Sequence, residues 1–368
     1  MEKTKILFTH NTAMWYRLPF FKQLAKIYDL DLVFTHINVI SDVYESDISS
    51  KIKGLEDVDY TILDNSHGFA RGLIKKAFAD YDILIGGSWD TPQELIETII
   101  LFTITQIRKK PFIIWREDWD WPKKKNLKEK ILEGIIKFLS NNASAILVPG
   151  SLHKSYFQNK IKVKPEKIFI MPNVSNITGF KKKALPTNKK KILYVGRLIP
   201  RKGVKYLLEA YEQLNISDTE LIIIGTGPDE EKLKEYVKKN NMKNVVFTGK
   251  IENNQLKKYY NESCLVVIPS INEGMGDPWV FVLNEAMYYE NPIIATDAVG
   301  AALDMIKDNG FIVEEKNSTQ LKEAMLKILS DDKLQDMMSK KSRKIICEKF
   351  QYSNMVDGFN RAISYVKK

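Results

Sequence analysis

The sequence predicts an α/β protein built from two doubly wound domains that face a central cleft. Its 368 residues exceed what one hydrophobic core usually serves. Short apolar runs alternate with amphipathic stretches along the chain, which is typical of parallel sheets covered by helices on both faces. One lysine-rich stretch without periodicity, residues 176–191, interrupts the series. We therefore expect a linker there, and ligands bound beyond the carboxyl ends of the strands.

The first predicted domain covers residues 1–175 and opens on a strand, because MEKTKILFTHN has too short an apolar run for a secretion signal. Its strand-like runs are KILFTH, LDLVFTH, YDILIGG, FIIW, AILVPG and KIFIMPN. Residues 95–107 are largely apolar but include Glu97 and Gln106, and they fall short of the roughly 20 apolar residues that cross a bilayer. We expect a packed helix there and a cytoplasmic protein.

Residues 121–139 predict an amphipathic helix, with Leu127, Ile131, Ile135 and Phe138 at helical spacing beside several lysines. Two interpretations stay open at this point. The helix packs on the sheet with its lysines in water, or its apolar face lies on an anionic membrane surface. The net charge of +10 favours anionic partners of any kind and does not decide between them.

The second predicted domain covers residues 192–351. Its strand-like runs are KILYVGR, ELIIIGTG, NVVFTGK, CLVVIPS, PIIATD and GFIV. The residues that follow, 352–368, look like one further helix. Cys264 and Cys347 have neither disulfide nor metal-ligand spacing, so we expect two buried thiols in a reducing compartment.

The first loop of the second domain, in VGRLIPRKG, contains Gly196, Arg197, Lys202 and Gly203. A glycine permits close backbone approach, and two cations beside a helix start favour phosphate oxygens. The segment is therefore a candidate diphosphate clamp. Taken alone, it fits equally well with surface cations that bracket a strand-to-helix turn.

Several linked motifs then point to one family. VGRLIPRKG, IIGTGPDEEKL, VVFTGKI, VIPS and DPWVFVLNEAM occur in order across residues 192–315. This series resembles the nucleotide-sugar domain of the family 4 glycosyltransferases, which have the GT-B fold. The resemblance implies two Rossmann-like domains. Residues 1–175 would form the acceptor domain, completed by a helix at about 352–368, and residues 192–351 would bind the donor.

The resemblance also selects among the acids of EGMGDPWVFVLNEAM. The family has two acids eight positions apart, and Asp277 precedes Glu285 by eight residues, whereas Glu273 is out of register. By the resemblance, Glu285 binds the ribose of the donor and Asp277 binds its sugar. Aspartate replaces the commoner glutamate at 277, and Val280 stands where glycine is frequent, so the choice of sugar stays open.

The resemblance assigns the remaining site residues. The catalytic candidates are Arg197, Lys202, Asp277 and Glu285. The donor-binding candidates are Gly196, Arg197, Lys202, Gly249, Ile251, Asp277, Trp279, Val280 and Glu285. The acceptor candidates are Asn11, Tyr16 and Arg17 in the first loop, with Glu117 and Asp118 after the strand FIIW, where relatives often have a histidine or acid near the reacting sugar.

Matches to a D-x-D metal site occur at 80–82 and 118–120. Such short matches are common by chance, and Arg197 and Lys202 supply the positive charge that a metal otherwise brings. We expect no metal and no cofactor, the nucleoside diphosphate sugar being a substrate.

The resemblance implies a retaining glycosyltransferase that moves a sugar to a hydroxyl of a glycan or lipid-linked acceptor, in polysaccharide or glycolipid synthesis. One alternative is a nucleotide-sugar epimerase of the same fold. The other is a non-catalytic protein that binds nucleic acid or another anion. The lysines form no RNA-binding signature or aromatic-basic ladder, so we expect no nucleic-acid partner.

Overall fold

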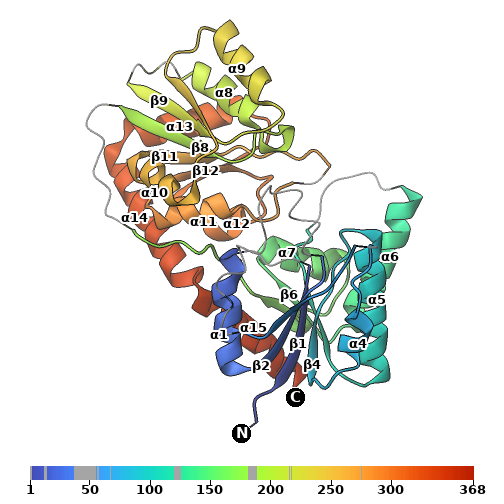
Figure 1. Ribbon diagram of the computed structural model, residues 1–368. Coiled ribbons are helices and arrows are strands. Elements are labelled where there is room, and N and C mark those ends of the chain that lie inside the picture. Colours follow the sequence, from blue (N-terminus) through green and yellow to red (C-terminus); the bar gives the residue numbers. More distant parts are fainter. Residues whose placement is uncertain are drawn as a thin grey trace. The chain divides into compact units, whose positions relative to one another are not determined.

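The computed structural model describes residues 2–11, 15–36, 55, 58–66, 68–119, 126–180, 189–214, 216, 218–274 and 276–368. The lysines at 123–125 and residues 181–188, which are half of the predicted linker, lie outside this set. The chain divides into two compact units. The first contains Met1–Asp120, Lys124–Asn176 and Tyr352–Lys368, and the second contains Ile177–Gln351 (Figure 1).

The first unit is built on a seven-stranded parallel sheet in the order β3-β2-β1-β4-β5-β6-β7. The strands are β1 (Lys5–His10), β2 (Asp29–Phe34), β3 (Tyr60–Ile62), β4 (Ile83–Gly86), β5 (Phe112–Trp115), β6 (Ala145–Val148) and β7 (Ile168–Ile170). The helices are η1 (Trp15–Arg17), α1 (Leu18–Ile27), α4 (Leu73–Ala77), α5 (Pro92–Ile107), α6 (Leu127–Asn142), α7 (Ser151–Ser155), η2 (Tyr156–Lys160), η3 (Pro165–Lys167) and α15 (Tyr352–Val366).

Both faces of this sheet are covered, because successive side chains of each strand point to opposite sides. In β1, Phe8 packs into the cluster under α1 and α15, and Leu7 packs into the cluster under α5 and α6. Helices α1 and α15 lie side by side although they come from opposite ends of the sequence (Figure 1). The Phe359 ring of α15 stacks on the Phe8 ring with centroids 6.0 Å apart, and the Phe21 ring of α1 meets Phe8 edge-on at 5.3 Å.

The second unit is built on a six-stranded parallel sheet in the order β10-β9-β8-β11-β12-β13. The strands are β8 (Lys190–Val195), β9 (Thr219–Ile224), β10 (Val245–Gly249), β11 (Leu265–Ile268), β12 (Ile293–Thr296) and β13 (Gly310–Val313). The helices are η4 (Pro200–Lys202), α8 (Val204–Glu212), α9 (Glu230–Lys239), α10 (Asn253–Glu262), α11 (Phe281–Tyr288), α12 (Ala302–Met305), α13 (Ser318–Ser330) and α14 (Asp332–Lys349).

Each sheet has one point at which the strand order reverses, between β1 and β4 in the first unit and between β8 and β11 in the second. In open parallel sheets, ligands bind in the crevice outside the carboxyl ends of the two strands that flank this point. The loops after β1, β4, β8 and β11 are therefore the candidate ligand-binding loops of the fold.

The structure corrects two details of the sequence analysis. Strand β3 was not predicted, because its residues are half-exposed or exposed and leave no apolar run. Cys264 is buried as expected, but Cys347 is exposed on α14, which overturns the expectation of two buried thiols. Among the described residues, the helices are all too short or too polar to cross a membrane.

Candidate functional site

The loops beside the strand reversal of the second sheet bring Lys202 and Asp277 together. Lys202 ends η4, which follows β8, and Asp277 lies in the segment after β11. The Lys202 ammonium forms an ion pair with the Asp277 carboxylate, whose side chain is only 7% exposed. Arg201 approaches the second carboxylate oxygen at 3.4 Å, and the Ser270 hydroxyl donates to the first at 3.0 Å. The carboxylate is thus buried but surrounded by partners.

The backbone explains why these loops meet. Gly203, at φ 66°, lies in the left-handed region, and a Cβ on it would stand 1.8 Å from the carbonyl oxygen of Pro269. Only glycine therefore allows the loop after β8 to touch the loop after β11. The Ile271 amide donates to the Arg201 carbonyl at 2.8 Å and fixes the same contact. Asp277 is held in turn by its amide, which donates to the Ala298 carbonyl at 3.1 Å.

Arg197 does not join this cluster. Its side chain is exposed, and its carbonyl accepts a hydrogen bond of 2.9 Å from the Tyr194 hydroxyl. Burial raises the pKa of Tyr194, and the negative charge of Asp277 raises it further. Gly196 lies against Gly225, where a Cβ would stand 1.9 Å from the Gly196 carbonyl. The loop is compact around its glycines, and the guanidinium of Arg197 extends into solvent.

Glu285 occupies a different position from Asp277. It lies on α11, and its Oε2 accepts a hydrogen bond of 2.8 Å from the Tyr260 hydroxyl of α10. Glu273, the acid that the sequence analysis rejected, is exposed. The two acids of the predicted pair therefore have separate surroundings, one beside cations and one beside a buried phenol.

The other predicted donor residues border the same loops. Trp279 and Val280 are 6% exposed, and both side chains pack in the core under α11. The Trp279 indole donates to Asn284 at 3.0 Å. Gly249 ends β10 with φ 71°, and Ile251 follows it, partly buried against the same core. Val280 directly precedes α11 at the N-cap position, where its side chain forms no capping hydrogen bond.

In the first unit, Arg17 and Glu117 lie together at the carboxyl ends of the strands. The Arg17 guanidinium forms an ion pair of 3.0 Å with Glu117 and lies 4.4 Å above the Trp115 ring. It also contacts the His10 ring, at the end of β1. Asn173 donates to the same Glu117 oxygen at 2.8 Å. These two donors orient the Glu117 carboxylate, and the Glu117 side chain remains 30% exposed.

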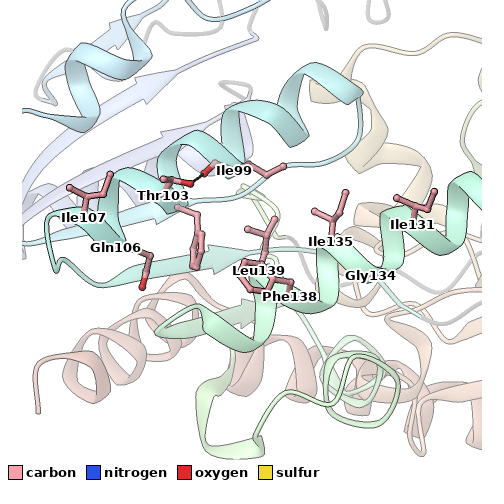
Figure 2. A pocket seen from close by; sticks show the side chains of 10 residues that line it. Ile99, Thr103, Gln106, Ile107, Ile131, Gly134, Ile135, Phe138 and Leu139 are labelled. Carbon is pink, nitrogen blue, oxygen red and sulfur yellow. Dashed lines mark hydrogen bonds between the residues drawn. The ribbon is translucent and has the colours of Figure 1, made fainter.

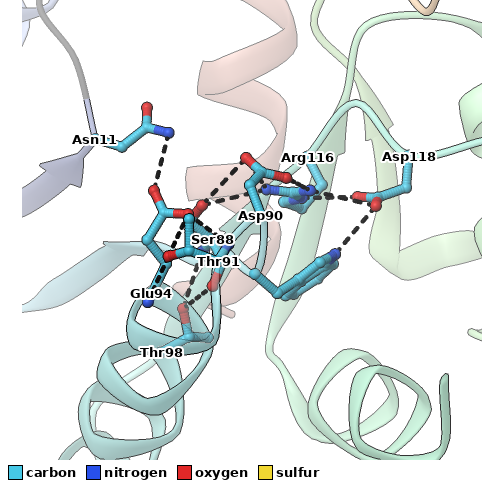
Figure 3. A network of polar contacts seen from close by, with 9 residues as sticks. Asn11, Ser88, Asp90, Thr91, Glu94, Thr98, Arg116 and Asp118 are labelled. Carbon is cyan, nitrogen blue, oxygen red and sulfur yellow. Dashed lines mark hydrogen bonds and ion pairs between the residues drawn. The ribbon is translucent and has the colours of Figure 1, made fainter. Parts of the chain in front are cut away.

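The remaining acceptor candidates, Asn11, Tyr16 and Asp118, have different partners. Asn11 donates to Glu94 at 3.2 Å, at the start of α5 (Figure 3). The Tyr16 side chain lies beside Arg17, whose guanidinium is 5.6 Å from the ring centroid. The Asp118 carboxylate forms an ion pair of 2.7 Å with Arg116 and accepts a hydrogen bond of 3.0 Å from the Trp89 indole.

Arg116 is the centre of the cluster that holds Asp118. Its guanidinium, in a side chain 11% exposed, bridges Asp118 and Asp90 and lies 4.6 Å above the Trp89 ring (Figure 3). Burial opposes ionisation of Asp90, but the charge of Arg116 together with the hydrogen bonds from Arg116 and Ser88 outweighs burial and lowers the pKa of that carboxyl. Asp118 therefore has a structural partner, and the third residue of its D-x-D match, Asp120, lies outside the described residues.

An apolar groove of about 540 Å³ runs between α5 and α6. Figure 2 shows Ile99 and Ile107 of α5 facing Ile131, Ile135 and Phe138 of α6 across it. Ile135 packs partly on the core, whereas Ile131 is 57% and Phe138 60% exposed. The predicted amphipathic helix exists from Leu127 onward, begins at an Asn126 cap, and both packs on the sheet and presents apolar side chains to solvent.

Three contacts of the site were not predicted from the sequence. Arg201 adjoins Lys202 in the PRKG motif, so a second cation was visible there. Ser270 and Tyr260 gave no comparable signal, because they lie 7 and 25 residues from the acids that they contact. Contacts at such separations depend on the packing of loops and helices.

The fold, with two parallel sheets and polar loops at their carboxyl ends, is that of the GT-B glycosyltransferases. Residues 176–345 match the family model for glycosyl transferases group 1, so the chain carries a group 1 glycosyltransferase domain. The chain is similar along nearly its whole length to HepE of Anabaena, whose structure was solved in complex with UDP. That likeness has a TM-score of 0.74 at 16% identity and covers 98% of this chain and 100% of HepE.

Sequence relatives agree on the class. An uncharacterized glycosyltransferase of Methanocaldococcus jannaschii is 28% identical over 171 residues, which are 46% of each chain. The N-acetylgalactosamine-N,N'-diacetylbacillosaminyl-diphospho-undecaprenol 4-alpha-N-acetylgalactosaminyltransferase of Campylobacter jejuni is 26% identical over 226 residues, or 60% of each chain. The chain thus spans about half the length of the first curated relatives that it matches.

Proposed function

We propose that this protein is a retaining, metal-independent family 4 glycosyltransferase that moves a sugar from a nucleoside diphosphate to an acceptor hydroxyl. The observation that carries the proposal is the meeting of Lys202 and Asp277 at the strand reversal of the second sheet. A cation there suits a diphosphate, and an acid beside it suits sugar hydroxyls. The UDP named in the structure of HepE supports a nucleoside diphosphate as ligand.

In this proposal the cations act on the leaving group. When the sugar–phosphate bond breaks, negative charge develops on the diphosphate, and Lys202 and Arg197 stabilise it. The departing phosphate accepts the proton of the acceptor hydroxyl, and the acceptor oxygen bonds to the anomeric carbon on the face that the phosphate leaves, which retains the anomeric configuration. Asp277 orients the sugar as it gains oxocarbenium character, and Glu285 binds the ribose. These cations take the place of a metal ion.

A thermal-shift screen of nucleoside diphosphate sugars tests the donor class. A ligand at 100 times its dissociation constant stabilises the protein by about 2.7 kcal/mol. Product analysis by NMR then gives the anomeric configuration, and chelator should leave the rate unchanged. If no nucleoside diphosphate sugar shifts the melting curve, the proposal fails. Conversion of the donor without any acceptor would instead indicate the epimerase.

Strong binding of nucleic acid that falls steeply with salt, without any binding of nucleoside diphosphate sugars, would support the non-catalytic alternative.

Glu117 in the first unit fits the acceptor side of the reaction. Arg17 and Asn173 orient its carboxylate at the carboxyl end of β5, where an acceptor hydroxyl needs a hydrogen-bonding partner.

We further propose a lipid-linked acceptor and a peripheral position at the cytoplasmic face of a membrane. Leu127 (74%), Ile131 (57%) and Phe138 (60%) are exposed on α6, and Ile131 and Phe138 line the apolar groove (Figure 2). Several lysines precede and line this helix in sequence, and each lysine near an anionic surface adds about 1 kcal/mol. The name of the Campylobacter relative, with its diphospho-undecaprenol, supports this class of acceptor.

Vesicle co-sedimentation tests the membrane contact. Anionic vesicles should bind the protein and release it with added salt, because salt screens exposed charges. Replacing the lysines at 123–125 by glutamine should weaken binding, as should Ile131→Ser. Equal binding to neutral and anionic vesicles, or no loss in the lysine variant, would leave α6 as a packed helix with a solvated face.

A further inference from the structure

The carboxylate of Glu285 accepts a hydrogen bond from a buried phenol. The Tyr260 hydroxyl donates to Glu285 Oε2 at 2.8 Å, and the Tyr260 side chain is 1% exposed. Tyr260 belongs to α10 and Glu285 to α11, so the contact joins two helices that are separate in sequence. A buried hydroxyl that lost this acceptor would be left without water to replace it.

Tyr260 is itself fixed on two sides. Its ring stacks on Tyr289, with centroids 5.6 Å apart and planes only 6° from parallel. Its carbonyl accepts from the Asn291 side chain at 3.1 Å, and that fully buried amide also donates to the Ala286 carbonyl at 3.2 Å. The phenol thus has little freedom, and neither has the carboxylate oxygen bonded to it.

The proton of this hydrogen bond stays on the tyrosine. Burial raises the pKa of Tyr260 well above its usual value, and the negative charge of Glu285 raises it further. Tyr260 is therefore a donor at every physiological pH, and Glu285 accepts. This hydrogen bond holds the terminal torsion of the Glu285 side chain at one angle, whereas that torsion is otherwise broad and easily changed.

We infer that Tyr260 is a positioning residue that orients Glu285 toward the ribose hydroxyls of the donor. This inference rests on the proposed function, in which Glu285 binds that ribose. A carboxylate accepts two neighbouring hydroxyls well only when both oxygens lie in the right plane. Tyr260 sets that plane without touching the nucleotide, and so it governs how strongly the protein distinguishes a ribose from a deoxyribose.

The test compares UDP, GDP and ADP with their 2′-deoxy forms by calorimetry, on the full chain. The wild type should bind one of the three about tenfold more tightly than its 2′-deoxy form, which is the usual value of a hydrogen bond to a charged group. Tyr260→Phe should reduce this ratio to about twofold and leave binding of the deoxy form nearly unchanged. Tyr259→Phe, the same change at the neighbouring position of α10, should leave the ratio at the wild-type value.

A double-mutant cycle separates positioning from packing. Glu285→Ala should abolish the ratio, and adding Tyr260→Phe to it should produce no further loss, because the phenol acts only through the carboxylate. Melting curves show that each variant is folded. A wild-type ratio retained in Tyr260→Phe would overturn the inference and leave the proposed function intact. A wild type that binds none of the diphosphates, or binds both forms equally, would instead overturn the proposed role of Glu285.

Discussion

Replacing Lys202 by methionine removes one charge from a largely buried ion pair of the second unit and keeps most of the apolar stem. The Lys202 side chain is 17% and the Asp277 side chain 7% exposed. Removing one partner of a fully buried pair costs about 3–5 kcal/mol. Here Arg201 remains 3.4 Å from Asp277, and Ser270 still donates to it. We therefore expect a loss nearer 2 kcal/mol, or about 4–8 °C in melting temperature.

The catalytic effect should be larger than the effect on stability. A charged donor aimed at a developing negative charge contributes about 100-fold or more to the rate. In the variant, kcat should fall by about that factor and the donor KM should change less, because the interaction strengthens as the diphosphate leaves. Sugar transfer from the donor found in the thermal-shift screen provides the assay, at a temperature well below the melting curve of the variant.

Lys205→Met is the matched control. Lys205 lies three residues further along, is 64% exposed, and forms an ion pair of 3.6 Å with Glu209 on the surface of α8. This variant should resemble the wild type in both melting temperature and turnover. Turnover of Lys202→Met within about threefold of the wild type, with a lowered melting temperature, would show that Lys202 serves the loop and not the reaction.

Three further predictions concern other charged residues of the two units. Arg197→Ala should lower turnover about 100-fold but shift the melting temperature by less than about 2 °C, because Arg197 is exposed; normal turnover would mark it as a surface cation. Asp277→Asn should damage activity at least about tenfold more than Glu273→Gln, since Asp277 is buried beside cations and Glu273 is exposed, and the reverse ranking would identify Glu273 as the family acid. Asp90→Asn should cost at most about 1 kcal/mol at pH 7, because that carboxylate is 57% exposed beside Arg116. Its folded pKa is lowered, so this stability is present above the unfolded pKa near 3.9 and is lost as pH falls through the folded value; a melting difference that grows on acidification would contradict the assignment.

Most of the fold could be predicted because strands buried on both faces leave continuous apolar runs. Ile113 and Ile146 stand in such runs, and their strands are neighbours in the sheet. Tyr60 and Ile62 do not belong to a continuous apolar run, because β3 is half-exposed at the edge of the sheet. Helix α6 was predicted from its periodicity, but the groove that it forms with the neighbouring α5 could not be predicted from its own sequence.

The candidate site was predictable residue by residue but not contact by contact. Lys202 and Asp277 were each identified from their motifs, yet they are 75 residues apart and meet only because two loops touch at Gly203. The register that favoured Asp277 over Glu273 gave no information on what would surround either acid. Tyr260 carries no motif at all, and its role depends on how α10 packs against α11.

The placement of α15 in the first unit has a consequence for synthesis. Met355, Phe359 and Ile363 of this helix belong to the core that β1 and α1 begin. That core stays open until α15 has left the ribosome, whereas residues 177–351 form an uninterrupted segment. The second unit can therefore fold during translation while the first still exposes apolar surface. Until α15 emerges, it is the half made first that depends on protection from aggregation.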